Sequence, residues 1–171
     1  IHVDSETWGP VKRYLYGEMG TPKEERCMHE EWDARLVEDI LAESLEITDY
    51  QKRKGRPPFH QALIIEDLAT RSDVVRQGII NTVFTRARHG FLSVLVKSQS
   101  YSFISPAVRK NNDLFIFRLR TNSDLEKVLD ELSAIAPGGR KQVLEMYNYA
   151  TTHTPFGFLF CELSKGGRAP D

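Results

Sequence analysis

The chain has little cysteine, almost no net charge and no long apolar run, and each absence excludes a class of protein. Its two cysteines, Cys27 and Cys161, lie far apart and match no metal-ligand spacing, which favours free thiols in a reducing compartment. No apolar segment is long enough to span a bilayer, and no signal peptide is recognisable. The net charge of -1 argues against a protein that coats nucleic acid by bulk charge, which leaves only a local basic patch. We therefore expect a soluble, intracellular protein without a membrane partner.

The sequence also lacks a phosphate-binding loop. The pattern G-x-x-x-x-G-K-[ST], whose backbone amides and lysine hold nucleotide phosphates, does not occur in it. The chain begins at Ile1, inside a strand-like Ile1-His2-Val3, so we expect an upstream portion to have been left out or removed. Without such a loop, the 171 residues should bind ATP poorly, because an acidic site alone cannot hold the phosphates.

The sequence does contain amphipathic helices that alternate with apolar strands. Apolar residues at helical spacing predict helices over 32–50, 72–90, 123–135 and 140–151, with the basic stretch 51–58 ending the first helix and a capping box formed by Ser123 and Glu126. Apolar runs predict strands over 61–66, 91–96, 113–119 and 156–163. Strands that are apolar on both faces favour an α/β fold, a mostly parallel sheet sandwiched by helices. We expect an irregular region at 1–31 that opens with a short strand, a core at 32–163 and a flexible tail at 164–171.

Two adjacent carboxylates, Glu66 and Asp67, end the apolar run that starts at Ala62. Ligands of parallel sheets bind beyond the carboxyl ends of the strands, where these acids are expected to emerge. One carboxylate can hold Mg²⁺ through its waters while its neighbour orients or deprotonates the attacking water, as in a Walker B site. The alternative is a polar strand end that meets a helix cap, since many buried parallel strands end in an acid.

Four other side chains are candidates for the same site. Gln99 follows the second strand and can bridge the attacking water to the terminal phosphate, because an amide both donates and accepts; alternatively it only anchors a loop. Arg86, Arg88 and Arg109 are candidate arginine fingers, which neutralise charge on the transferred phosphoryl group, commonly from a neighbouring subunit. The alternative for an arginine at a helix end is to complement the helix dipole.

The densest positive cluster is a candidate DNA contact. Backbone phosphates attract positive charge without regard to sequence, and a solvated loop is the alternative. The cluster consists of Lys52, Arg53, Lys54 and Arg56.

Four segments, taken together, resemble the poxvirus-type genome-packaging ATPases of large DNA viruses, virophages and related transposons, within the FtsK and HerA group of DNA pumps. In order, the segments are Leu63-Ile64-Ile65-Glu66-Asp67, Phe84-Thr85-Arg86-Ala87-Arg88-His89, Ser98-Gln99-Ser100-Tyr101 and Val108-Arg109-Lys110-Asn111-Asn112. In that family an acidic pair completes the magnesium site, T-R-x-R-H ends the next helix, a glutamine closes the following strand and R-x-N comes after it. The match covers roughly 32–163.

The resemblance implies a fold, ligands and partners. The implied fold is that of a P-loop NTPase of the RecA or FtsK-HerA type whose N-terminal part is missing, and the implied ligands are Mg²⁺ and ATP. The implied partners are double-stranded DNA, identical subunits in a ring, and viral capsid or portal components, in a host cytoplasm or nucleus or in the virion. Two features depart from the family: the glycine loop is missing, and the acidic pair is Glu-Asp rather than Asp-Asp or Asp-Glu.

Two other functions remain open. One is a non-catalytic relative that keeps the fold as an assembly or DNA-binding module. The other is a metal-dependent nuclease built on Glu66 and Asp67, with Asp4 and Glu6 as the additional acids that it would need.

Overall fold

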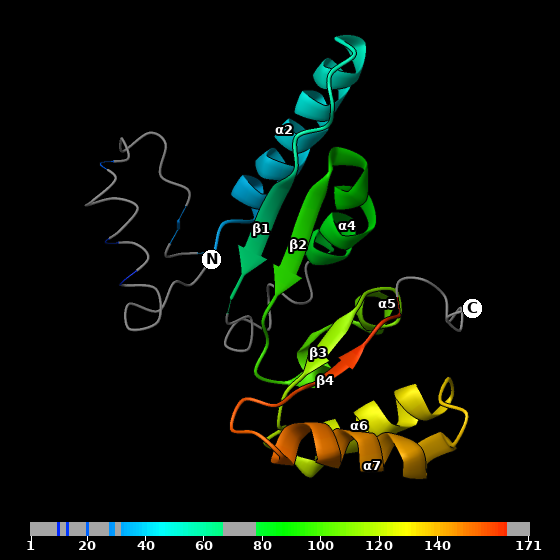
Figure 1. Ribbon diagram of the computed structural model, residues 1–171. Coiled ribbons are helices and arrows are strands. Elements are labelled where there is room, and N and C mark those ends of the chain that lie inside the picture. Colours follow the sequence, from blue (N-terminus) through cyan, green and yellow to red (C-terminus); the bar gives the residue numbers. More distant parts are fainter. Residues whose placement is uncertain are drawn as a thin grey trace. The chain divides into compact units, whose positions relative to one another are not determined.

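The computed structural model describes residues 32–66 and 78–163, together with five isolated positions before residue 32. The chain divides into two compact units, residues 1–98 and residues 99–171, each with its own hydrophobic core (Figure 1). Nothing in the composition predicts this division. The domain limits expected from the sequence therefore remain predictions.

The first unit is built on two parallel strands and the helices that precede and join them. α2 (Ala34–Arg53) leads into β1 (Gln61–Ile65), and α4 (Ile79–Arg86) with the short 3-10 helix η4 (Ala87–Gly90) leads into β2 (Leu92–Val96). β1 and β2 pair in parallel from Gln61 opposite Leu92 to Ile65 opposite Val96. Asp33 caps α2 by accepting from the amides of Arg35 and Leu36, which explains why the helix begins there.

One face of this parallel pair is covered and the other is not. Leu63 and Ile65 of β1 are buried in one cluster with Val37 and Leu41 of α2 and with apolar residues of α4. On the opposite face Ile64 and Leu95 are 38% and 53% exposed. Within the described residues both helices therefore pack on the same side of the sheet, as alternation along a strand requires.

The second unit pairs its strands in the opposite sense. η5 (Tyr101–Phe103) and α5 (Pro106–Arg109) precede β3 (Leu114–Ile116), and α6 (Asn122–Ser133) and α7 (Gly139–Thr152) precede β4 (Leu159–Cys161). β3 and β4 are antiparallel, with Phe115 opposite Phe160 and Ile116 opposite Leu159. The two helices pack against each other over the buried side of the strands, around Val128, Leu129 and Val143 (Figure 1).

The structure therefore confirms a mixed α/β protein with a small parallel sheet and corrects the expected sheet. The strands predicted at 113–119 and 156–163 do not join the parallel pair but form a separate antiparallel pair. On the second face of β1 and β2 the side chains of Ile64 and Leu95 are exposed, so the described residues show helices on one face only, and the sandwich stays a prediction. Apolar runs specify strands, but they do not specify which strands pair or what covers each face.

The helices lie where the apolar periodicity predicts them, but two of their end residues differ from the prediction. α2 continues through Arg53, so the basic stretch ends the helix only at Lys54. α6 is capped by Thr121, whose hydroxyl accepts from the amide of Asp124, so the cap lies two residues before the Ser123 that the sequence predicts. Both Thr121 and Ser123 are good caps, and tertiary contacts of Asp124 select the first. The Ser72 cap expected for the second helix lies outside the described residues.

Two further expectations concern the solvent and redox environment. No helix of the described residues is long and apolar enough to cross a membrane. Cys161 is a free thiol, as predicted, and its burial raises its pKa to about 11. Cys161 packs, partly buried, against the core of the second unit. Cys27 lies outside the described residues.

Candidate functional site

The carboxyl edge of the parallel pair is where the sequence places the catalytic acids. Glu66 directly follows β1, and Lys97 directly follows β2. The register continues past the strands, because the amide of Lys97 donates to the carbonyl of Ile65 at 2.9 Å. The two side chains form an ion pair with Lys97 Nζ 3.1 Å from Glu66 Oε1. The Glu66 side chain is 12% exposed and the Lys97 side chain is 63% exposed, so the pair joins a largely buried carboxylate to a cation that lies in solvent.

The other two groups expected beside Glu66 are Asp67 and Gln99, and the described residues do not test that placement. Asp67 lies outside those residues. Gln99 is exposed and is the first residue of the second unit, two positions after Lys97. The functions assigned to Asp67 and Gln99 therefore stay predictions.

Arg86 and Arg88 lie at the opposite edge of the parallel sheet from Glu66. Arg86 is the last residue of α4, and Arg88 lies in η4, which ends just before β2 begins. The starts of the two strands meet there, since the amide of Gln61 donates to the carbonyl of Phe91 at 3.1 Å. Five residues of strand separate this edge from Glu66, or about 16 Å at roughly 3.3 Å per residue. Both arginines are exposed and so can meet another molecule, but not the Glu66 of their own chain.

The basic cluster also lies on the side of the sheet where the strands begin. Lys52 and Arg53 form the last turn of α2, Lys54 caps it, and Arg56 precedes β1. Figure 1 shows the end of α2 extending past the start of β1. All four are exposed, and one weak contact joins Lys52 to Asp49 at 3.9 Å. The cluster complements the dipole of α2 and still offers its charge to solvent.

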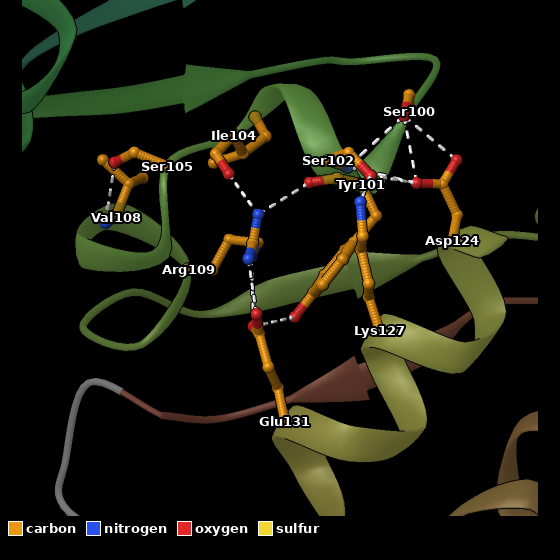
Figure 2. Close-up of polar contacts among 10 residues, drawn as sticks. All are labelled: Ser100, Tyr101, Ser102, Ile104, Ser105, Val108, Arg109, Asp124, Lys127 and Glu131. Atoms are coloured by element: carbon orange, nitrogen blue, oxygen red, sulfur yellow. Dashed lines mark hydrogen bonds and ion pairs between the residues drawn. The ribbon is translucent and has the colours of Figure 1, made fainter.

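The structure places Arg109 differently from the prediction (Figure 2). Its guanidinium forms two hydrogen bonds to Glu131 of α6, donates to the carbonyls of Tyr101 and Ile104, and lies 4.5 Å from the centre of the Tyr101 ring. Arg109 is only 5% exposed. With four hydrogen bonds from its five donors, Arg109 supports the loop 100–112 on α6 and cannot reach a nucleotide without breaking that arrangement.

A second polar group anchors the same loop to the start of α6. Asp124 accepts from the hydroxyls of Ser100 and Ser102 at 3.0 and 2.7 Å and from the amide of Ser102 at 3.2 Å. Lys127 donates to the hydroxyl of Ser102 at 2.6 Å (Figure 2). A serine between a lysine and a carboxylate can be nucleophilic in other settings. Here the Ser102 hydroxyl donates to Asp124, which also accepts from the hydroxyls of Ser100 and Thr121 and from the Ser102 amide, and this indicates a structural role.

The titration of these groups follows from their contacts. Burial by itself would raise the pKa of Asp124, but the hydrogen bonds from Ser102 and Ser100 outweigh it and lower that pKa. Burial likewise opposes ionisation of Glu131, and the bonds from Arg109 and Tyr101 lower its pKa on balance. The pKa of Tyr101 is raised, first by burial and then by its bond to Glu131, so its hydroxyl stays protonated.

Sequence reasoning missed Asp124 and Glu131, the acids that fix this loop. Both lie on an amphipathic helix, where an acid is usually assigned to the solvent face. The available signal was the position of Asp124 three residues after Thr121, which marks the first turn of a helix. No local pattern could have paired Glu131 with Arg109, which is 22 residues away.

The described residues contain no group of three histidine, cysteine, aspartate or glutamate side chains that could hold a metal ion. A magnesium ion bound through waters and phosphates needs only one or two carboxylates, and Glu66 is one carboxylate at the edge where the sequence predicts such a site. Comparisons of the chain with family models, with curated proteins and with solved structures found no match.

Proposed function

We propose that this chain is the carboxyl-terminal part of an ATP-driven DNA-translocating ATPase of the genome-packaging type. The observation that carries the proposal is the position of Glu66, which is mostly buried at the carboxyl edge of a parallel β-α-β pair, where it pairs with Lys97. That is where open α/β sheets bind ligands, and a P-loop NTPase sheet of the RecA or FtsK-HerA type would extend this pair. The resemblance of the four ordered segments supplies the family.

The position of Arg86 and Arg88 supports an assembly of identical subunits. Both lie about one strand length from Glu66, so in this proposal they serve the nucleotide of a neighbouring subunit in a ring. Arg109 is left out of the proposed set because its guanidinium is occupied by Glu131. Lys52, Arg53, Lys54 and Arg56, exposed on that same side, are proposed to contact the DNA backbone.

In this proposal Glu66 and Asp67 would hold Mg²⁺ through its waters, and the ion would neutralise the phosphates of ATP. Lys97 is a competitor for the same carboxylate: its ammonium occupies Glu66 when no ion does. The phosphate-binding loop is not among the 171 residues, so ATP turnover requires a chain that also carries G-x-x-x-x-G-K-[ST].

The test is ATP hydrolysis by a chain extended upstream of Ile1, where the proposal expects the glycine loop. Glu66→Gln should lower the turnover number by about 10²- to 10⁴-fold, because it removes the acid–base group of the site. Glu46→Gln, which alters an exposed carboxylate of α2, should leave turnover unchanged. Mixing Glu66→Gln subunits with Arg86→Ala or Arg88→Ala subunits should restore part of the hydrolysis. Full activity of Glu66→Gln, or no glycine loop upstream, would refute the proposal.

A non-catalytic assembly or DNA-binding module is the second candidate, because the missing glycine loop favours it directly. It predicts DNA binding without any turnover, even in the extended chain. The nuclease reading has no such support: the described residues add no third acid to Glu66, and Asp4 and Glu6 lie outside them.

A further inference from the structure

The antiparallel pair of the second unit presents a face made of phenylalanine. Alternation along both strands puts four phenylalanines on one side, where each is 42–55% exposed: Phe115, Phe117, Phe158 and Phe160. Their rings touch across the strands, with centroids 4.9 Å apart for Phe115 and Phe160 and 5.3 Å apart for Phe117 and Phe158. The other side of the same strands carries Ile116 and Leu159 into the core with α6 and α7. We call the four phenylalanines the aromatic face.

Positive charge and hydroxyl groups lie at one end of this face. An open cavity of about 430 Å³ is lined there by Phe117, Arg118, Phe156 and the turn that follows α7. Arg118 and Arg120 are exposed, and His153 and Thr154 line the same turn. The imidazole of His153 bonds the carbonyl of Tyr149 at 3.0 Å. The hydroxyls of Thr151 and Thr152 also donate to carbonyls of α7. These carbonyls are therefore occupied, and they repel an anion at the end of the helix less than free carbonyls would.

The opposite end of the face is acidic. Asp113 precedes β3 and Glu162 follows β4, and the amide of Leu163 donates to Asp113 at 3.0 Å. The charge therefore changes sign along the face. Among the described residues the positive charge lies at the cavity end, so a polyanion is attracted to that end, which distinguishes this surface from a uniformly apolar one.

The size of the aromatic face selects among occupants. Its rings, with the 86%-exposed Phe156, offer on the order of 500 Å² of apolar surface, from roughly 200 Å² per phenylalanine. A stable protein–protein interface buries about 800 Å² on each partner, so this face is small for a dimer of its own. Two cross-strand pairs of rings suit two or three stacked bases, as in sheet-based readers of single strands.

We propose that the second unit binds single-stranded nucleic acid. Bases stack on Phe115, Phe117, Phe158 and Phe160, and a backbone phosphate lies at the cavity, where Arg118 neutralises it. Stacking on a ring does not depend on which base is present, so the site has little sequence preference. This goes beyond the proposed ATPase, whose partner is double-stranded DNA contacted on the first unit, and it needs no ATP.

The test is the fluorescence anisotropy of a labelled 12-mer of thymidine, a length of about one binding site, titrated with the 171-residue chain without ATP. The single strand should bind at least about tenfold tighter than a duplex of the same length. Phe117→Leu and Phe158→Leu should each weaken binding about fivefold or more, because leucine keeps apolar area but lacks a ring face for stacking. Arg118→Gln should reduce the salt dependence by about 0.7 in the log–log slope, the value for one phosphate of a single strand.

Matched controls lie on the same unit. Ile135→Ala removes an exposed apolar side chain away from the face, and Lys141→Gln removes an exposed cation; neither should change binding. Glu66→Gln should also leave it unchanged, so failure of the ATPase proposal and failure of this one are separable. Circular dichroism and thermal unfolding check that the leucine variants fold, and Arg118→Gln alters only an exposed side chain.

Three results would overturn the proposal. The first is equal affinity for single strand and duplex, and the second is wild-type affinity of both leucine variants. The third is a concentration-dependent dimer in analytical ultracentrifugation that the face variants disrupt while nucleic acid binding is absent. That last result would assign the aromatic face to a second copy of the chain.

Discussion

The two units use charged side chains in opposite ways. In the first unit the core is apolar, and its charged candidates, Glu66 with Lys97 and the exposed Arg86 and Arg88, lie at the rim of the sheet. In the second unit Arg109 and its acid partner lie inside and bond each other and the backbone. The same residue types therefore act as candidate chemistry in one unit and as structural ties in the other. Burial of the cation separates the two uses: the Arg109 side chain is enclosed, whereas Lys97 and the two arginines of the first unit are exposed.

The contrast matters most for the three arginines. The sequence offers Arg86, Arg88 and Arg109 as equivalent candidates, since each lies in one of the segments that resemble the packaging ATPases. In the structure two of them are exposed and one is enclosed. An arginine finger must reach a neighbour's phosphate, so an occupied guanidinium is excluded by its own hydrogen bonds.

The largest expected effect is from Arg109→Ala. Removing this side chain leaves Glu131 without its main partner, and breaking a buried pair costs about 3–5 kcal/mol of stability. Arg140→Ala is the matched control, because Arg140 also forms ion pairs, with Glu126 and Asp130, but between exposed side chains. Its loss should cost about 1 kcal/mol of stability or less. Urea unfolding followed by circular dichroism measures both. Equal losses would remove the distinction between an enclosed arginine pair and an exposed one.

The next effect is the acid sensitivity of the second unit. The folded-state pKa values of Asp124 and Glu131 are both lowered, so their contribution is complete above the unfolded value of about 4 and is lost as the pH falls through the folded values. Asp124→Asn should cost about 2 kcal/mol at pH 7, since it replaces hydrogen bonds to a charged group. It should also flatten the loss of stability as the pH falls below about 4 in thermal melts, and an unchanged acid profile would contradict the network.

Gly90→Ala should break the first unit through packing rather than charge. A Cβ at this position would lie 2.6 Å from the hydroxyl of Ser44, which is buried and bonded to the carbonyl of Leu41. η4 would have to move away from α2, at a cost of about 1–3 kcal/mol. Gly78→Ala is the control, because no atom lies within 4 Å of its added Cβ. A melting temperature that falls equally in both variants would argue against close packing of η4 on α2.

The smallest effect on stability is expected from Lys97→Met. The lysine is 63% exposed, so losing its pair with Glu66 should change the free energy of unfolding by less than about 1 kcal/mol. In the extended, ATP-hydrolysing chain the same change should lower the Mg²⁺ concentration needed for half-maximal turnover, because the ammonium that competes with the ion for Glu66 is gone. A large loss of stability instead would make Lys97 a structural residue like Arg109.

The sequence by itself determined the elements and the position of the acidic edge. Helical periodicity located α2, α6 and α7 to within a few residues, since an apolar stripe must recur at about 3.6 residues to bury one side. Apolar runs located β1 and β2. Because Glu66 directly follows β1 in the sequence, recognising the strand was enough to place Glu66 at its carboxyl end. These are local properties, so a single sequence suffices for them.

Only the tertiary structure decided how strands pair and which charges are enclosed. β3 and β4 read like the parallel strands but pair with each other in antiparallel sense, because pairing depends on contacts between segments more than 40 residues apart along the chain. Glu131 selects Arg109 for the same reason, since a helix face and a loop meet only after folding. The exposed aromatic face follows from that pairing as well: alternation orders the phenylalanines, and the absence of a covering helix among the described residues leaves them in solvent.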